Sequence, residues 1–243
     1  MGRPLLAIKN ITVVADKKEV VKDFSLIIRA GETHFLLGPN GSGKTSLCWA
    51  ILGHPNYRIT RGDILWKGKS VLALTTEQRA RLGIFLSFQE PPGIAGVSVG
   101  SFLQTTARAL GGKTVQWEPK HAQTVMRRLG MPNSLLERSL NEGFSGGEKK
   151  KGEMLQLAAA RPQCALLDEI DAGIDIDSLK SIATILRAAT KKGMGMLFIT
   201  HTLRAARALR PDAVHIIKDG RMVASGTTAI LKKLERGGFT QFI

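Results

Sequence analysis

The 243-residue chain has 35 Lys and Arg residues and 20 Asp and Glu residues, which gives a formal net charge of +15. This length fits one large domain, or a domain that carries an inserted subdomain. Hydrophobic residues make up 43% of the chain and charged residues 23%, which excludes a wholly disordered protein. No apolar run reaches the roughly 18 residues that span a bilayer. The first ten residues lack the apolar core of a signal peptide, so we expect a cytoplasmic protein without membrane insertion.

The basic residues are scattered along the chain, without a long basic tract or a basic run interleaved with aromatic residues. A solvated surface is therefore expected rather than a nucleic-acid interface. The two cysteines, Cys48 and Cys164, lie far apart and predict neither a disulfide framework nor a cysteine metal site. The acidic residues do form a cluster in the sequence, which suggests that they act on a bound cation. They are Asp168, Glu169, Asp171, Asp175 and Asp177.

The first third of the chain is rich in short β-type runs. We expect strands over residues 5–14, 20–29, 33–37, 63–66, 70–74 and 84–88, and helices over 44–52 and 77–82. Residues 90–98 contain two prolines and two glycines, and we expect them to form a loop.

The strand signal vanishes between residues 99 and 140, where helices are expected over 102–110 and 119–129. Helix and strand patterns then alternate. Helices are expected over 148–160, 177–190, 203–209 and 230–236, and strands over 164–167, 194–199, 213–217 and 221–224. The pattern predicts an α/β fold that is β-rich at its start and has a helical insertion near the middle.

A glycine-rich loop between an apolar strand and a helix matches the phosphate-loop pattern G-x-x-x-x-G-K-[ST]. Its residues are Gly38, Pro39, Asn40, Gly41, Ser42, Gly43, Lys44 and Thr45. Glycines let successive N–H groups turn toward phosphate oxygens, and the helix N-terminus adds a favourable dipole. Lys44 would neutralise the β- and γ-phosphates, Thr45 would ligate Mg²⁺, and Ser46 can bond an α-phosphate.

A second acidic site follows the apolar strand 164–167, which ends in Asp168 and Glu169. A carboxylate at the C-terminal end of a strand, beside the phosphate loop, can hold Mg²⁺ through its water shell. We assign this role to Asp168. Glu169 is then placed to polarise the water that attacks the γ-phosphate.

Further motifs, in the same order along the chain, resemble those of ATP-binding-cassette ATPases. The stretch Phe144, Ser145, Gly146, Gly147 and Glu148 resembles the family signature at the start of a helix. Gln89 resembles the Q-loop glutamine that contacts Mg²⁺ and senses the γ-phosphate, and His201 resembles the switch histidine. Residues 172–175, ending in Asp175, resemble the D-loop. The resemblance covers essentially the whole chain.

This resemblance implies one cassette ATPase domain over residues 1–243. Residues 1–89 and 163–243 would form the catalytic core, with a mixed sheet and an N-terminal antiparallel β subdomain, and residues about 90–162 an inserted helical subdomain. It also implies ATP and Mg²⁺ as cofactors. Two copies would join head to tail, because the signature of one protomer caps the ATP held by the phosphate loop of the other. The first hairpin departs from the pattern, since it lacks an aromatic residue for adenine. We expect Val14 or Val20 to pack there instead.

Several segments resemble the SufC-type ATPases of iron–sulfur cluster assembly. They are the Q-loop region 83–98, the variant signature 144–151, the acidic stretch 168–177, residues 210–215 and the tail 234–239. Glu90 departs from this pattern, because an aromatic residue more often follows the glutamine. The resemblance implies scaffold partners of the SufB and SufD type, and the apolar stretch 91–99 is the candidate contact patch.

Three lysines, at positions 149–151, follow the signature. Cations near a helix N-terminus oppose the helix dipole. One hypothesis is that one of them pairs with Glu169 or Glu148 and holds the catalytic acid off-line. The alternative is a solvated face. For the whole chain, the alternatives are an importer ATPase coupled to a membrane permease, a DNA-associated cassette ATPase favoured by the charge, and a binding-only cassette.

Overall fold

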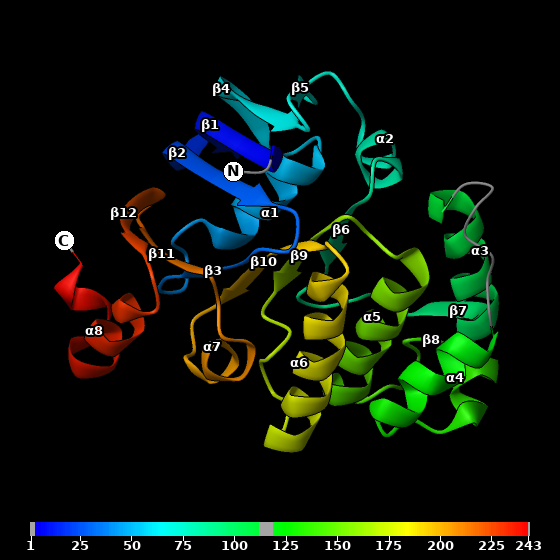
Figure 1. Ribbon diagram of the computed structural model, residues 1–243. Helices are drawn as coiled ribbons and strands as arrows, with labels where there is room; N and C mark the ends of the chain where they lie inside the picture. Colours follow the sequence, from blue (N-terminus) through cyan, green and yellow to red (C-terminus); the bar gives the residue numbers. More distant parts are fainter. Residues whose placement is uncertain (1–2, 112–118, 243) are drawn as a thin grey trace.

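The structure is a computed structural model that describes residues 3–111 and 119–242. Residues 1, 2, 112–118 and 243 of the predicted domain ranges lie outside the described residues. Figure 1 shows a small antiparallel sheet at one side of a larger central sheet, with helices on the opposite side.

The central sheet has six strands in the order β12-β11-β3-β10-β9-β6. They are β3 (Thr33–Leu37), β6 (Ile84–Ser87), β9 (Cys164–Asp168), β10 (Gly195–Thr200), β11 (Ala213–Lys218) and β12 (Arg221–Gly226). The five strands from β11 to β6 run parallel, and β12 is antiparallel to β11 at the edge. This mixed sheet confirms the predicted fold class.

The N-terminal sheet is antiparallel, with strand order β2-β1-β4-β5. Its strands are β1 (Pro4–Ala15), β2 (Lys18–Arg29), β4 (Arg58–Trp66) and β5 (Lys69–Ser70). The prediction of a strand over residues 70–74 is wrong, because β5 ends at Ser70. The next residues turn toward a helix, and the amide of Leu74 donates to the Val71 carbonyl.

The helices surround the central sheet. They are α1 (Lys44–Leu52), α2 (Thr76–Arg81), α3 (Val99–Gly111), α4 (Pro119–Arg128), α5 (Gly146–Ala160), α6 (Ile176–Lys191), α7 (Arg204–Leu209) and α8 (Ala229–Gly237), with 3₁₀ turns η2 (Asn133–Glu137) and η3 (Gly238–Gln241). Helices α3 and α4 both pack on α5, and α5 packs on α6 (Figure 1).

Residues 90–98 were expected to form a loop, and this prediction is wrong in part. Strand β7 (Ile94–Ser98) pairs with the two-residue strand β8 (Ser139–Leu140). The segment is mostly exposed and contains Gly96 in a left-handed conformation, so its local pattern does not resemble a buried strand. The pairing depends on residues more than 40 positions away, which local periodicity does not detect.

Alternate residues of the parallel strands face two different cores. Leu36, Leu166 and Leu197 pack with α1 and the antiparallel sheet. Phe35 and Phe198 point to the other face, stack at 4.7 Å between ring centroids, and pack with α5 and α6. Strands buried on both faces need continuous apolar runs, and the sequence supplies them.

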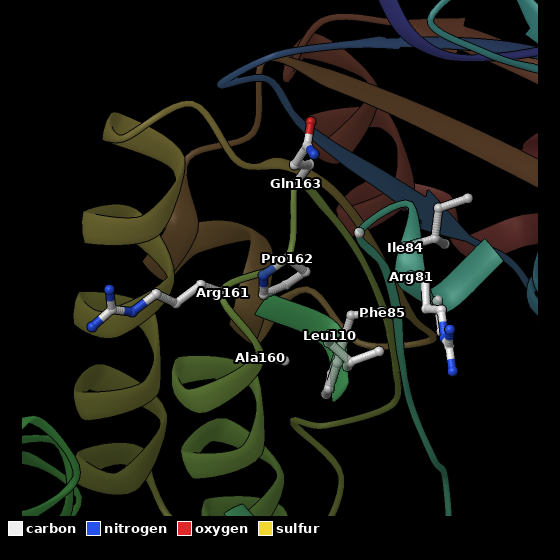
Figure 2. A pocket seen from close by; sticks show the side chains of 10 residues that line it. Arg81, Ile84, Phe85, Leu110, Ala160, Arg161, Pro162 and Gln163 are labelled. Carbon is white, nitrogen blue, oxygen red and sulfur yellow. The ribbon is translucent and has the colours of Figure 1, made fainter. Parts of the chain in front are cut away.

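A small pocket of about 160 Å³ lies where the beginning of β6 meets the ends of α3 and α5 (Figure 2). Phe85, Leu110 and Ala160 line it, while the Arg161 side chain extends away from it toward α6. It lies at the amino ends of β6 and β9, and therefore opposite the strand ends that carry the predicted chemistry.

Candidate nucleotide-binding site

The predicted site residues follow four neighbouring parallel strands of the central sheet. The phosphate loop follows β3, Gln89 follows β6, Glu169 follows β9 and His201 follows β10. In parallel α/β sheets, the carboxyl ends of the strands meet at one edge, where ligands bind. The sheet order β3-β10-β9-β6 therefore brings together residues that are more than 160 positions apart in the sequence.

The phosphate loop depends on glycines where the backbone has no room for a side chain. Gly43 has φ of 100°, and a Cβ atom there would lie 2.4 Å from the Val20 carbonyl oxygen. A Cβ atom at Gly38 would lie 2.3 Å from the carbonyl oxygen of Ile217. The loop therefore lies close to the backbones of β2 and β11, and helix α1 starts directly behind it.

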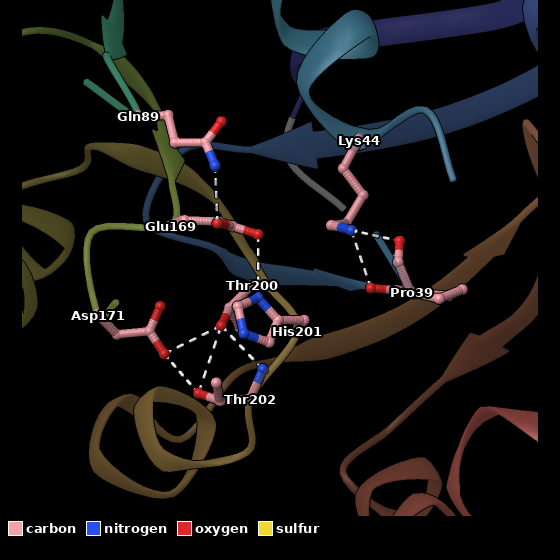
Figure 3. Close-up of polar contacts among 9 residues, drawn as sticks. Pro39, Lys44, Gln89, Glu169, Asp171, Thr200, His201 and Thr202 are labelled. Carbon is pink, nitrogen blue, oxygen red and sulfur yellow. Dashed lines mark hydrogen bonds and ion pairs between the residues drawn. The ribbon is translucent and has the colours of Figure 1, made fainter. Parts of the chain in front are cut away.

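Lys44 lies inside this loop. Its ammonium group donates to the carbonyl oxygens of Gly38 and Pro39, both at 2.8 Å (Figure 3). The residue is 5% exposed, and burial lowers the pKa of Lys44 from its ordinary value. Among the described residues, its hydrogen-bond partners are these two neutral carbonyls, so the buried ammonium group is poised for an anionic partner such as a phosphate.

A cavity of about 580 Å³ opens beside the loop. Residues 40–46 line it together with Gln89 and Glu169, and Val20 lies on its wall. Val14, the other predicted adenine contact, does not line it. Sequence reasoning also missed Lys18 and Lys22, which line the cavity from strand β2, and Asp219, which lines it from the turn between β11 and β12; none of them belongs to a recognisable motif.

Glu169 is held between two predicted site residues. Gln89 Nε2 donates to Glu169 Oε2 at 3.0 Å, and His201 Nδ1 lies 3.0 Å from Glu169 Oε1 (Figure 3). The backbone of Glu169 has φ of 50°, an uncommon conformation for a residue with a side chain. Strained backbone is often found at functional sites. A carboxylate in this position can orient a water molecule and accept its proton.

Asp168 is the deeper of the two acids. It is 2% exposed, and burial raises the pKa of Asp168 even though the Thr45 hydroxyl hydrogen-bonds to the carboxylate. Its Oδ1 atom is buried and has no hydrogen-bond partner in the structure. A carboxylate oxygen and a hydroxyl are ligands that Mg²⁺ prefers. The donor set at Asp168 and Thr45 therefore fits Mg²⁺, and both Thr45 and Gln89 line the cavity.

A hydrogen-bond network braces the loop that carries His201. Asp171 Oδ2 accepts from the hydroxyl of Thr200 at 2.9 Å and from that of Thr202 (Figure 3). The Thr202 amide in turn donates to the Thr200 hydroxyl at 3.0 Å. These bonds fix both neighbours of His201 and leave its ring free to reach Glu169.

The signature residues form the start of α5. The Ser145 hydroxyl accepts from the Glu148 amide, and the Glu148 carboxylate accepts from the Ser145 amide, which is a capping box. Asp175 caps α6 in a similar way by accepting from Ser178. These hydrogen bonds lower the pKa of Asp175 to about 2. Neither the signature nor Asp175 lines the cavity at the phosphate loop of the same chain.

The lysine-latch hypothesis is wrong for Glu169. Among the described residues, the side-chain partners of Glu169 are Gln89 and His201, and none of the three lysines contacts it. For Glu148, the ion-pair partner in the described part of the chain is Arg138 at 3.9 Å, and Lys151 acts on Glu148 only through its charge. Lys150 donates instead to the Phe88 carbonyl at 3.2 Å and to the Gln89 carbonyl at 2.6 Å. Burial lowers the pKa of Lys150.

The fold and this arrangement define a phosphate-loop nucleotide-binding protein, and the comparisons with known proteins identify its family. The ABC transporter family matches residues 21–172, and the chain belongs to this family. It is an ABC-type ATPase, a subunit that binds and hydrolyses ATP.

Relatives and solved structures match over nearly the whole chain. A Streptococcus pyogenes serotype M3 protein named a probable ABC transporter ATP-binding protein is 42% identical over 241 residues, covering 97% of this chain and 93% of that protein. A Guillardia theta protein named probable ATP-dependent transporter ycf16 is 37% identical, covering 98% of this chain and 97% of that protein. A solved ATP-binding subunit of an ABC transporter matches with a TM-score of 0.80 at 25% identity, over 96% of this chain and 95% of that one.

Every helix within residues 3–111 and 119–242 is too short or too polar to cross a membrane.

Proposed function

We propose that this ATPase is a SufC-type subunit, which uses ATP to change the shape of a SufB- and SufD-type scaffold complex during iron–sulfur cluster assembly. The observation that carries the proposal is the variant signature 144–151, with Phe144 first, Glu148 fifth and three lysines after it. The Q-loop region and the acidic stretch 168–177 support it. Both lie at the carboxyl edge of the sheet, where a γ-phosphate would be sensed.

In the proposed site, the phosphate loop and Lys44 bind the phosphates of ATP. Thr45, Asp168 and Gln89 would hold Mg²⁺, which would neutralise charge on the β- and γ-phosphates when bound. Glu169 accepts the proton of the attacking water. His201 and Gln89 hold the carboxylate of Glu169 from two sides, which fixes the direction in which it accepts that proton.

The active form is proposed to be a head-to-tail dimer. Ser145, Gly146 and Gly147 lie at the start of α5, where the N–H groups of the two glycines offer an anion site, while the Ser145 N–H is bound by Glu148. They do not line the cavity of their own chain, so they are available to the nucleotide of a second copy, together with Glu148 and Asp175. ATP would then join two copies and hydrolysis would release them.

The scaffold is proposed to contact the Q-loop. Residues 92–96 of this segment are exposed, and Ile94 keeps 39% of its surface in solvent. Phe88 is 37% exposed, and its ring centroid lies 5.5 Å from that of Trp49. The Trp49 ring also stacks on Tyr57. An apolar and aromatic surface next to Gln89 suits a protein partner that responds to the nucleotide.

The proposed division of the chain keeps residues 1–89 and 163–243 as the catalytic core and about 90–162 as a helical subdomain. The mutual packing of α3, α4 and α5 supports it. Location in the cytoplasm and the absence of a nucleic-acid partner also remain predictions from the sequence.

Identification of the native partners tests this function. We would purify the tagged protein gently from its own organism and analyse the soluble and membrane fractions by mass spectrometry. SufB- and SufD-type proteins in the soluble fraction are expected, with Phe88→Ala as the variant that loses them. The names of the relatives favour a second candidate, the ATPase subunit of a transporter. A multispan permease recovered in the membrane fraction would therefore overturn the Suf assignment and leave the ATPase site intact.

A further inference from the structure

Where β6 leads into the Q-loop, the backbone stops being supported by the central sheet and is bound by helix α5 instead. Ser87 belongs to the central sheet, because it pairs with Leu167 of β9 and its hydroxyl accepts from the Asp168 amide at 2.9 Å. The next residue, Phe88, no longer belongs to the strand. The side chains that fix its backbone come from α5.

Two residues one turn apart on α5 bind this part of the backbone. Glu153 Oε1 accepts from the Phe88 amide at 2.6 Å. Lys150 donates to the carbonyl oxygens of Phe88 and Gln89 at 3.2 Å and 2.6 Å. Both polar groups of the Phe88 backbone are therefore bound by α5, and the carbonyl of Gln89 is bound as well.

Glu153 is an unusual choice for this interior position. It is 2% exposed, and its Oε2 atom is buried without a hydrogen-bond partner. Its α5 neighbours Met154 and Leu155 are buried apolar residues, so an apolar side chain would fit the packing at a lower desolvation cost. Burial raises the pKa of Glu153 to about 7. The carboxyl group offsets this desolvation cost by accepting a hydrogen bond from the Phe88 amide.

The hydrogen bonds of Glu153 and Lys150 to the Phe88–Gln89 backbone fix the position of Gln89. Its side chain reaches Glu169 across the cavity at 3.0 Å, as Figure 3 shows. A continuous set of hydrogen bonds thus leads from α5 to the Phe88–Gln89 backbone and on to the carboxylate that is proposed to activate water.

We propose that Glu153 is a positioning residue for ATP hydrolysis, which acts through the Phe88 amide to hold Gln89 in reach of Glu169. The inference rests on the proposed roles of Gln89 and Glu169. It assigns to α5, the helix that begins with the signature, a second task inside its own chain. A displacement of α5 relative to the sheet would move Gln89, because Ser87 stays with β9 while Phe88 follows Glu153.

A series of substitutions at position 153 tests the acceptor. Glu153→Gln keeps an oxygen at the same distance, whereas Glu153→Asp is one methylene too short and Glu153→Leu has no acceptor. We expect kcat to fall about tenfold or more in the Asp and Leu variants and to stay within about twofold of wild type in the Gln variant, while the KM for ATP is unchanged in all three. The KM is unaffected because the phosphate loop holds the nucleotide.

A double variant separates this positioning role from a loss of stability. If Glu153 acts through Gln89, Glu153→Asp lowers kcat in the wild-type background and has no further effect in the Gln89→Ala background. An equal loss in both backgrounds, or wild-type kcat in the Asp variant, overturns the inference. A Gln89→Ala variant with wild-type kcat would instead show that the proposed role of Gln89 is wrong. The comparison of Asp with Gln at position 153 holds even if the Leu variant does not fold.

Discussion

A chain of buried and partly buried hydrogen bonds links β3 to β11 and makes the stability of this protein sensitive to acid. His34 Nε2 lies 3.1 Å from Glu32 Oε2, His34 Nδ1 lies 3.0 Å from His215 Nε2, and His215 Nδ1 lies 2.9 Å from Ser225 Oγ. One assignment of protons satisfies every contact. His34 donates to Glu32, His215 donates to His34, and Ser225 donates to His215. In this arrangement both rings are neutral.

A proton added to His215 would occupy Nδ1 and remove the acceptor of the Ser225 hydroxyl. Burial, and to a smaller extent the repulsion that a protonated His34 would exert, lowers the pKa of His215 from 6.5 to about 4. The pKa of His34 is lowered too, chiefly by burial. The unfolded chain therefore binds a proton at a higher pH than the folded chain does. Stability falls as the pH drops below the unfolded pKa, and the effect levels off near the folded pKa.

The expected loss from His215 follows from its two pKa values. Between about pH 7.5 and pH 5 the linkage relation gives a loss of about 2 kcal/mol in the free energy of unfolding. Glu153 acts in the opposite direction, because its raised pKa adds stability as the pH falls. The effect of His215 is therefore read from a difference between variants, and not from the wild-type curve alone.

The assay is urea unfolding of the wild type and of His215→Gln at both pH values. The variant is expected to be less stable at neutral pH and to lose about 2 kcal/mol less on acidification. The reasoning is refuted if His215→Gln and wild type lose the same stability between the two pH values.

Two further substitutions test how the phosphate loop and α1 are supported. The Arg79 guanidinium donates to four backbone carbonyls, including those of Ala50 and Ile51 at the end of α1. Arg79→Met should lower the free energy of unfolding by about 4 kcal/mol in urea titrations, and a loss below about 1 kcal/mol would contradict this role. Gly43→Ala should lose ATP binding in a fluorescent-nucleotide titration and about 2 kcal/mol of stability, because its Cβ meets the Val20 carbonyl. Gly68→Ala is the matched control, since φ is also positive there but its Cβ has open space and the residue does not line the cavity, so ATP binding by that variant should persist.

Much of the fold could be predicted because its parallel strands are short, continuous apolar runs that end at recognisable motifs. The segment 164–167 is an example, since its buried residues lead directly to Asp168. Strands β7 and β8 could not be found in this way. They are short, partly exposed and stabilised by each other, and the partner of Ile94 is Leu140.

The site also contains residues that the sequence could identify and residues that it could not. Phosphate and water chemistry singled out Lys44 and Glu169 in the sequence, and both line the same cavity in the structure. Val20 was one of two predicted adenine contacts, and the cavity distinguishes it from Val14. The role of Lys150 was misjudged, because its true partners are backbone carbonyls, which have no sequence signal.

The substitution Glu169→Gln tests the central claim most directly. Gln keeps the size and shape of the side chain but cannot accept a proton from water. Measured together by light scattering and phosphate release, the variant should form a dimer with Mg²⁺ and ATP and show no turnover. Hydrolysis at the wild-type rate would show that Glu169 is not the catalytic base and would contradict the account given for the site.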